Sequence, residues 1–230
     1  MTVQLMLTCL GDSLYGSVGI AAARVLEAFG CTVEFPEDQT CCGQPSFNSG
    51  DWASSRQIAS HCLSVFNPTV PIVTPSTSCA AMINHGYRQL FPHRAEFPVC
   101  YELTQFLVDV LQIETWPGRV KAQRLQVHVG CHGRAIGVST QPRRLLETIP
   151  GVEIVPFDNQ EQCCGFGGSF STKHPFVSSE IGNEKLRTLG SIRTVSTDLG
   201  CLMHLQGLAR FNRNPIEVVH VAEFLAEALP

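Results

Sequence analysis

The cysteines of this chain define an internal repeat. Eleven cysteines occur in 230 residues, at positions 9, 31, 41, 42, 62, 79, 100, 131, 163, 164 and 201. A shift of 122 residues carries one set of four onto another: Cys9, Cys41, Cys42 and Cys79 onto Cys131, Cys163, Cys164 and Cys201. Two sets of four with the same internal spacing indicate two copies of one structural unit.

The sequences around the two sets agree with this interpretation. Leu5-Met-Leu-Thr-Cys9 corresponds to Val127-His-Val-Gly-Cys131, and Cys41-Cys-Gly43 corresponds to Cys163-Cys-Gly165. Trp116-Pro-Gly-Arg119 contains a turn-forming dipeptide between the copies. We therefore predict two domains, residues 1–118 and 119–230.

Within each copy, predicted strands alternate with predicted helices. In the first copy the strands are 5–8, 33–35 and 70–74, and the helices are 19–29, 52–66 with Asp51 as N-cap, and one that Cys79 opens. This alternation predicts an α/β fold with parallel sheets. Because the carboxyl ends of parallel strands meet at one edge, the four cysteines of each set are expected to converge there.

Composition and the N-terminus limit the class of protein. The net charge of −4 gives no basic stripe for nucleic acid. Residues 1–9 carry no charged region or long apolar run of a signal peptide, and no segment reaches the ~18 apolar residues of a membrane span. We expect a cytoplasmic protein whose thiols are reduced, so that the cysteines serve metal or redox chemistry.

The two sets of cysteines are the candidate metal ligands. Gly43 and Gly165 allow the backbone to bend so that adjacent cysteines serve one site. Thiolates select iron–sulfur clusters or zinc, and no CxxC pair, typical of structural zinc sites, occurs in the chain. Cys31, Cys62 and Cys100 have no counterparts at the 122-residue shift and are expected to be buried packing residues.

Three other residues near the motifs need an interpretation. Met82 and His204 stand where a second cysteine would complete a CxxC after Cys79 and Cys201. We expect Met82 in the core, and we favour a structural role over metal ligation for His204 and for His132, which follows Cys131.

The cysteine motifs resemble those of a known domain family. A single Cys, Cys-Cys-Gly some thirty residues later, and a further Cys beyond it resemble the CCG domain, which occurs in tandem in the cysteine-rich subunit of heterodisulfide reductase and in the iron–sulfur subunit of glycolate oxidase. Thr8-Cys-Leu-Gly-Asp12, Cys41-Cys-Gly-Gln-Pro45 and Cys163-Cys-Gly-Phe-Gly-Gly168 are most similar to the lactate utilization protein A family. The resemblance implies two pseudo-symmetric, Rossmann-like CCG domains.

It also implies a function. The chain would be the iron–sulfur subunit of a multi-subunit complex that oxidises L-lactate, working with a ferredoxin-like iron–sulfur subunit and a third subunit. Cys9, Cys41, Cys42 and Cys79 would hold one centre, and Cys131, Cys163, Cys164 and Cys201 the other. Four thiolates fit a [4Fe–4S] or [2Fe–2S] centre better than a cluster that needs five cysteines.

The residues leave alternatives open. Oxidation of lactate needs a flavin or nicotinamide, and the chain has no G-x-G-x-x-G motif to bind one, so it is not expected to be a complete dehydrogenase alone. A scaffold subunit stabilised by zinc or by a non-redox cluster is the second hypothesis. A thiol–disulfide oxidoreductase that uses Cys41 and Cys42 is disfavoured, because vicinal disulfides are strained.

Overall fold

The chain forms two parallel sheets of four strands each. The computed structural model describes residues 1–230. The first sheet has the order β2-β1-β3-β4 and the second the order β6-β5-β7-β8. The strands are β1 (Thr2–Leu5), β2 (Thr32–Glu34), β3 (Ile72–Thr74), β4 (Cys100–Glu102), β5 (Gln123–His128), β6 (Val152–Ile154), β7 (Thr194–Ser196) and β8 (Val218–His220). The predicted α/β fold with a duplicated unit is confirmed.

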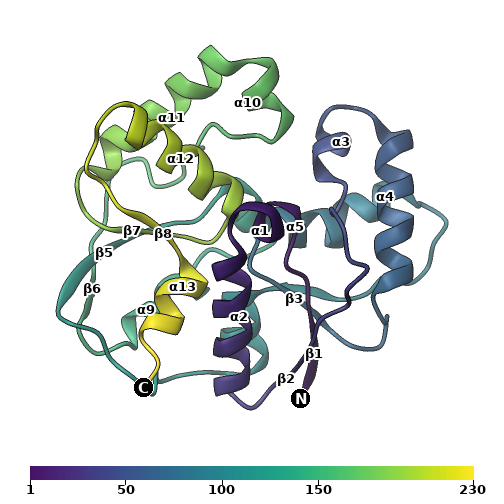
Figure 1. Ribbon diagram of the computed structural model, residues 1–230, viewed down its shortest axis with the longest axis horizontal. Coiled ribbons are helices and arrows are strands. Elements are labelled where there is room, and N and C mark those ends of the chain that lie inside the picture. The colour runs from purple at the N-terminus through teal and green to yellow at the C-terminus, as the bar shows by residue number, and fades with distance from the viewer.

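Helices connect the strands and cover the sheets (Figure 1). In the first half they are α1 (Cys9–Leu14), α2 (Gly16–Ala28), α3 (Gln44–Asn48), α4 (Trp52–Val65), α5 (Thr77–Ala81), α6 (Tyr87–Leu90) and α7 (Leu103–Gln105), with π-helical segments η1 (Met82–Gly86) and η2 (Phe106–Val110). In the second half they are α8 (Cys131–Ala135), α9 (Gln141–Glu147), α10 (Ser169–Lys173), α11 (Pro175–Leu189), α12 (Leu199–Phe211) and α13 (Val221–Glu227). Crossing a bilayer would take a longer and more apolar helix than any of these.

The repeat extends to the register of the strands. In the first sheet Gln4 of β1 lies opposite Ile72 of β3. In the second sheet Gln126 of β5 lies opposite Thr194 of β7, and both residues are shifted by 122 from their counterparts. The same strand pairing therefore presents both sets of cysteines at equivalent sheet edges.

The first strand begins and ends earlier than the predicted 5–8. Thr8 has a φ of 77° and is the N-cap of α1, with its hydroxyl accepting a hydrogen bond from the Gly11 N–H. Since the chain turns into a helix at this point, Cys9 is the first residue of α1. The predicted cap of α4 is confirmed, because the Asp51 carboxylate accepts a hydrogen bond from the Ser54 N–H.

The two halves share a hydrophobic core. One buried cluster includes Val3 of β1 and Val195 of β7. Helices α2 and α13 come from opposite ends of the chain and pack side by side (Figure 1). The connecting segment is fixed as well, since the Trp116 indole N–H donates to the Ala228 carbonyl at 2.9 Å. The halves are therefore held in one arrangement.

Candidate metal centres

The first set of cysteines converges at the carboxyl edge of the first sheet. Cys9 opens α1, Cys41 and Cys42 lie in the loop before α3, and Cys79 lies in α5. The Cys9 and Cys41 sulfurs are 3.6 Å apart, and the Cys42 and Cys79 sulfurs are 3.3 Å apart. Residues separated by up to 70 positions thus bring four thiols to one place.

The second set has the same arrangement. Cys131 opens α8, Cys163 and Cys164 lie in the loop before α10, and Cys201 lies in α12. The Cys164 and Cys201 sulfurs are 2.8 Å apart, and the Cys131 and Cys163 thiols are close enough to shift each other's pKa. Each half therefore forms a candidate metal site from the residues that the repeat predicts.

Both sites open into one cavity between the halves. The cavity has a volume of about 460 Å³, and all eight cysteines line it. Gly130 also lines it, and a Cβ atom there would lie 3.3 Å from the Cys201 sulfur, so glycine leaves space beside this ligand. The shared cavity was not foreseen from the sequence, because the repeat alone does not say how the halves face each other.

The glycines of the two Cys-Cys-Gly loops have the expected bend. Gly43 has a φ of 85° and Gly165 a φ of 89°. A serine of the following long helix holds each glycine: Ser55 of α4 donates to the Gly43 carbonyl at 3.0 Å, and Ser178 of α11 donates to the Gly165 carbonyl at 2.8 Å. Sequence reasoning missed these serines, which follow their glycines by 12 and 13 residues and so are not matched by the 122-residue shift.

One sulfur of each site is surrounded by hydrogen-bond donors. The thiols of Cys42 and Cys9 and the Gly43 N–H, at 3.4 Å, hold the pKa of Cys41 well below its usual range. The thiols of Cys131 and Cys164 and the Gly165 N–H, at 3.3 Å, lower the pKa of Cys163 in the same way. Each site thus has a preformed thiolate, the form that binds metal.

Two neighbouring thiols in each site hold their protons. Donation to Cys41 raises the pKa of Cys9 and of Cys42, and burial adds to the effect. Cys131 and Cys164 are raised in pKa by their hydrogen bonds to Cys163. Because a metal binds thiolates, its binding must release protons from these side chains.

Polar side chains fix the loops that carry the second site. Lys185 of α11 is fully buried and donates from Nζ to the carbonyls of Asn159 and Gln160, each at 3.0 Å. The Arg134 guanidinium donates to the carbonyls of Val129 and Glu161, which lie two residues before Cys131 and Cys163. These contacts tie the two cysteine-bearing loops together.

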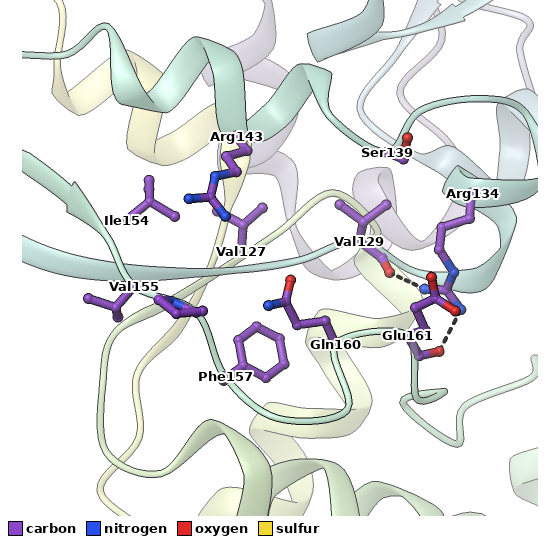
Figure 2. A pocket seen from close by; sticks show the side chains of 11 residues that line it. Val127, Val129, Arg134, Ser139, Arg143, Ile154, Val155, Phe157, Gln160 and Glu161 are labelled. Carbon is purple, nitrogen blue, oxygen red and sulfur yellow. Dashed lines mark hydrogen bonds between the residues drawn. The ribbon is translucent and has the colours of Figure 1, made fainter.

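Figure 2 shows the cavity beside Arg134, of about 160 Å³. None of the eight cysteines lines it, and its walls are mainly Val127, Val155 and Phe157 with two guanidinium groups. It carries no cluster of metal-ligating groups, so the candidate site is the cavity between the halves.

The histidine that lies nearest the buried cysteines is not one of those that the sequence analysis considered. The His204 Nε2 donates to the Ser178 carbonyl at 3.2 Å, and His204 is not among the residues gathered around the sulfurs. His132 has its Nδ1 3.8 Å from the Cys131 sulfur and its Nε2 3.2 Å from Gln44 Nε2 of the other half. The histidine nearest the buried sulfurs is instead His128, which sequence reasoning missed.

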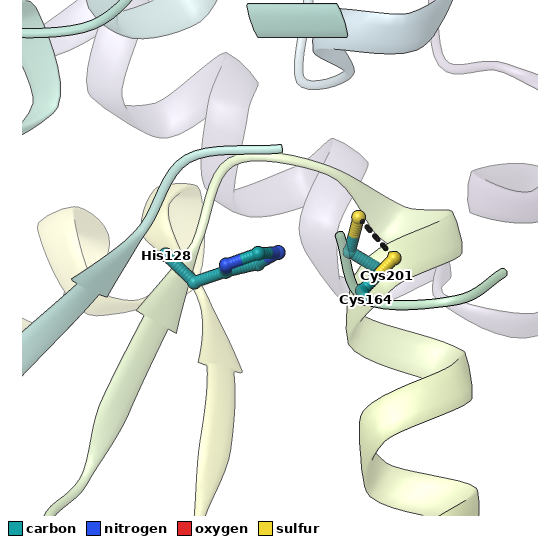
Figure 3. Close-up of side chains that lie close together, drawn as sticks. All are labelled: His128, Cys164 and Cys201. Atoms are coloured by element: carbon teal, nitrogen blue, oxygen red, sulfur yellow. Dashed lines mark hydrogen bonds between the residues drawn. The ribbon is translucent and has the colours of Figure 1, made fainter. Parts of the chain in front are cut away.

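His128 ends β5 and is fully buried. A ring nitrogen of His128 and the sulfurs of Cys164 and Cys201 all lie within 4.8 Å of one another, and Figure 3 shows the ring directed at the sulfur pair. Burial lowers the pKa of His128 to about 3, so the ring is neutral. The signal in the sequence was that a histidine replaces Met6 at the 122-residue shift.

The remaining cysteines lie in the core. Cys31, Cys62 and Cys100 are all buried, as expected for packing residues. All eleven cysteines are free thiols, so no disulfide occupies either site.

The donor sets fit a sulfur-ligated metal group. Each has four thiols, one of them preformed as a thiolate, beside a cavity between the halves. Soft thiolate ligands of this kind select iron–sulfur clusters or zinc. The residues present are therefore suited to a metal centre in each half.

Comparison with known proteins identifies the family of the repeated unit. The cysteine-rich (CCG) domain matches residues 3–84 and 125–206. Lactate utilization protein A of Anoxybacillus flavithermus is 40% identical over 98% of this chain and 99% of its own. The protein of the same name from Geobacillus kaustophilus is 42% identical over 98% of each chain. Lactate utilization protein A 2 of Bacillus cereus is 36% identical over 100% of this chain and 99% of its own.

A solved structure shares the fold. The crystal structure of a hypothetical protein from Helicobacter pylori matches 99% of this chain with a TM-score of 0.53 and 9% identity, and this chain spans 49% of that one. The likeness extends to the architecture alone. With two domain matches and relatives that agree over nearly its whole length, the chain belongs to the CCG cysteine-rich domain family, in the group that contains the lactate utilization A proteins.

Proposed function

We propose that this chain is the iron–sulfur subunit of a multi-subunit system that oxidises L-lactate. One observation carries the proposal: two equivalent sets of four thiols line a single cavity. The relatives named lactate utilization protein A support the choice of substrate. Cys9, Cys41, Cys42 and Cys79 would hold one centre, and Cys131, Cys163, Cys164 and Cys201 the other, with residues 1–118 and 119–230 as the two domains.

When bound, an iron–sulfur centre, either [4Fe–4S] or [2Fe–2S], supplies one-electron acceptance and donation. The chain's own residues prepare for it. Gly43 and Gly165 direct backbone N–H groups at the Cys41 and Cys163 sulfurs, and such donors help to stabilise negative charge on a ligand sulfur. The buried positions of Cys42 and Cys164 shield one side of each site from water.

The chain is proposed to act with other subunits. Removal of two electrons from lactate needs a flavin or nicotinamide, so we assign that step to a partner chain, with a ferredoxin-like subunit and a third subunit completing the complex. Free thiols throughout the chain favour a cytoplasmic location, where thiols stay reduced.

Anaerobic purification tests the proposal. The protein should be brown, should contain iron and acid-labile sulfide, and should give an electron paramagnetic resonance (EPR) signal after reduction with dithionite. Lactate should reduce it only when the co-purifying chains are present. A colourless protein with stoichiometric zinc would show instead that the centres are structural and that the chain is a metal-stabilised scaffold.

A further inference from the structure

His128 points at the second set of cysteines without a protein partner. Its side chain is fully buried, and neither Nδ1 nor Nε2 makes a hydrogen bond. Buried polar atoms in proteins are nearly always paired, because an unpaired one loses its hydration without compensation. A ring nitrogen within 4.8 Å of both the Cys164 and Cys201 sulfurs is placed to meet whatever these sulfurs bind (Figure 3).

The first half has an apolar residue at the same position. Met6 precedes His128 by 122 residues, is fully buried, and belongs to the same hydrophobic cluster as Cys42 and Cys79. A methionine needs no hydrogen-bond partner there, whereas an imidazole does. The two halves therefore place different side chains beside equivalent pairs of buried cysteines.

We propose that His128 is a nitrogen ligand of the metal centre in the second half, which is thereby a mixed cysteine–histidine centre. The centre in the first half has cysteine ligands alone. Neutral imidazole suits iron and zinc as a ligand, and the second half would then offer four thiols and one imidazole, against four thiols in the first half. The inference rests on the proposed function and adds to it that the two centres differ in their ligands.

The test uses the full chain, purified without oxygen and reduced, with all histidines labelled with ¹⁵N in one sample and unlabelled in the other. Pulsed EPR should detect a strongly coupled nitrogen whose coupling changes with the isotope. The unmodified protein suffices for this measurement, so it does not depend on whether a buried variant folds.

Variants then assign the nitrogen to a residue. His128→Met, which gives the second half the residue of the first, should remove the coupling. His132→Gln and His204→Gln, the matched controls, should leave the coupling in place. Met6→His should create a second coupled nitrogen.

The outcomes separate this inference from the proposed function. Iron and sulfide with a reducible signal but no isotope-sensitive coupling would overturn the assignment of His128 and leave the proposed function standing. A coupling that disappears in His132→Gln would overturn it as well. Protein without iron and sulfide would reject both proposals together.

Discussion

The Ser76 hydroxyl donates a hydrogen bond to the Asp198 carboxylate at 3.2 Å, and these two residues occupy equivalent positions in the two halves. Each caps the helix that carries the last cysteine of its own site: Ser76 accepts from the Cys79 N–H, and Asp198 from the N–H groups of Gly200 and Cys201. Asp198 also accepts from the Thr77 hydroxyl and the Ser78 N–H of the other half. The pseudo-symmetry axis of the molecule thus passes close to a hydrogen-bonded pair between the two sites.

The first prediction concerns this contact. Asp198→Ala should destabilise the protein by about 3 kcal/mol, because a buried carboxylate is lost and several donors are left unpaired. Ser76→Ala should cost about 1 kcal/mol. Chemical denaturation of both variants and of the double variant measures their coupling, which we expect to be about 1 kcal/mol. Strictly additive effects would contradict a direct interaction between the two halves here.

The second prediction asks whether the cavity holds two centres or one. Cys42→Ser and Cys164→Ser should each remove about half of the iron, since each cysteine belongs to a different set of four. Cys62→Ala, which alters a buried cysteine outside both sets, should retain all of it. Iron analysis of anaerobically purified protein decides the question. Complete loss of iron in either serine variant would indicate one centre shared by both sets.

Much of this architecture could be predicted from the sequence, because the 122-residue shift matches both the cysteines and the strand register. The convergence of each set followed from the rule that parallel strands end at one edge. The sequence could not predict that the two sets of cysteines face each other across one cavity. This arrangement depends on the packing of α2 against α13 and on the Asp198 contacts. His128 escaped notice because its place in an apolar strand is typical of a core residue.

The third prediction compares the two loop glycines. A Cβ atom on Gly165 would lie 2.4 Å from the Ser178 carbonyl oxygen, whereas one on Gly43 would have its nearest neighbours at 3.2 and 3.3 Å. Both glycines have a positive φ, so alanine is strained at each by roughly 1 kcal/mol. Gly165→Ala should therefore destabilise the protein clearly more than Gly43→Ala, by about 2 kcal/mol or more. Thermal unfolding of both variants checks this, and equal losses would be inconsistent with the backbone collision at Gly165.

The fourth prediction concerns pH. Glu102 and His220 end equivalent strands, are fully buried, and cap α7 and α13. Burial raises the pKa of Glu102 to about 7, against opposing hydrogen bonds from Thr104 and Gln105. Between pH 4.5 and 7 the folded protein therefore holds a proton that the unfolded chain has released. The contribution of Glu102 to stability is present below pH 4.5 and is lost as the pH rises to 7.

His220 acts in the opposite direction. Burial lowers its pKa to about 4, so its contribution to stability is present above pH 6.5 and is lost as the pH falls through 4. The two effects oppose each other in the wild type, which hides both in a simple pH profile. Glu102→Gln removes one of them while keeping an oxygen that caps α7.

Glu102→Gln should therefore gain stability relative to the wild type as the pH rises, by about 3 kcal/mol between about pH 4.5 and 7.5. Urea unfolding of both proteins across this range measures the difference, and the contribution of His220 cancels because both proteins contain it. The direction in which this stability difference changes with pH decides whether the prediction holds. A difference that stays constant with pH, or that falls as the pH rises, would show that Glu102 is ionised in the folded protein throughout this range.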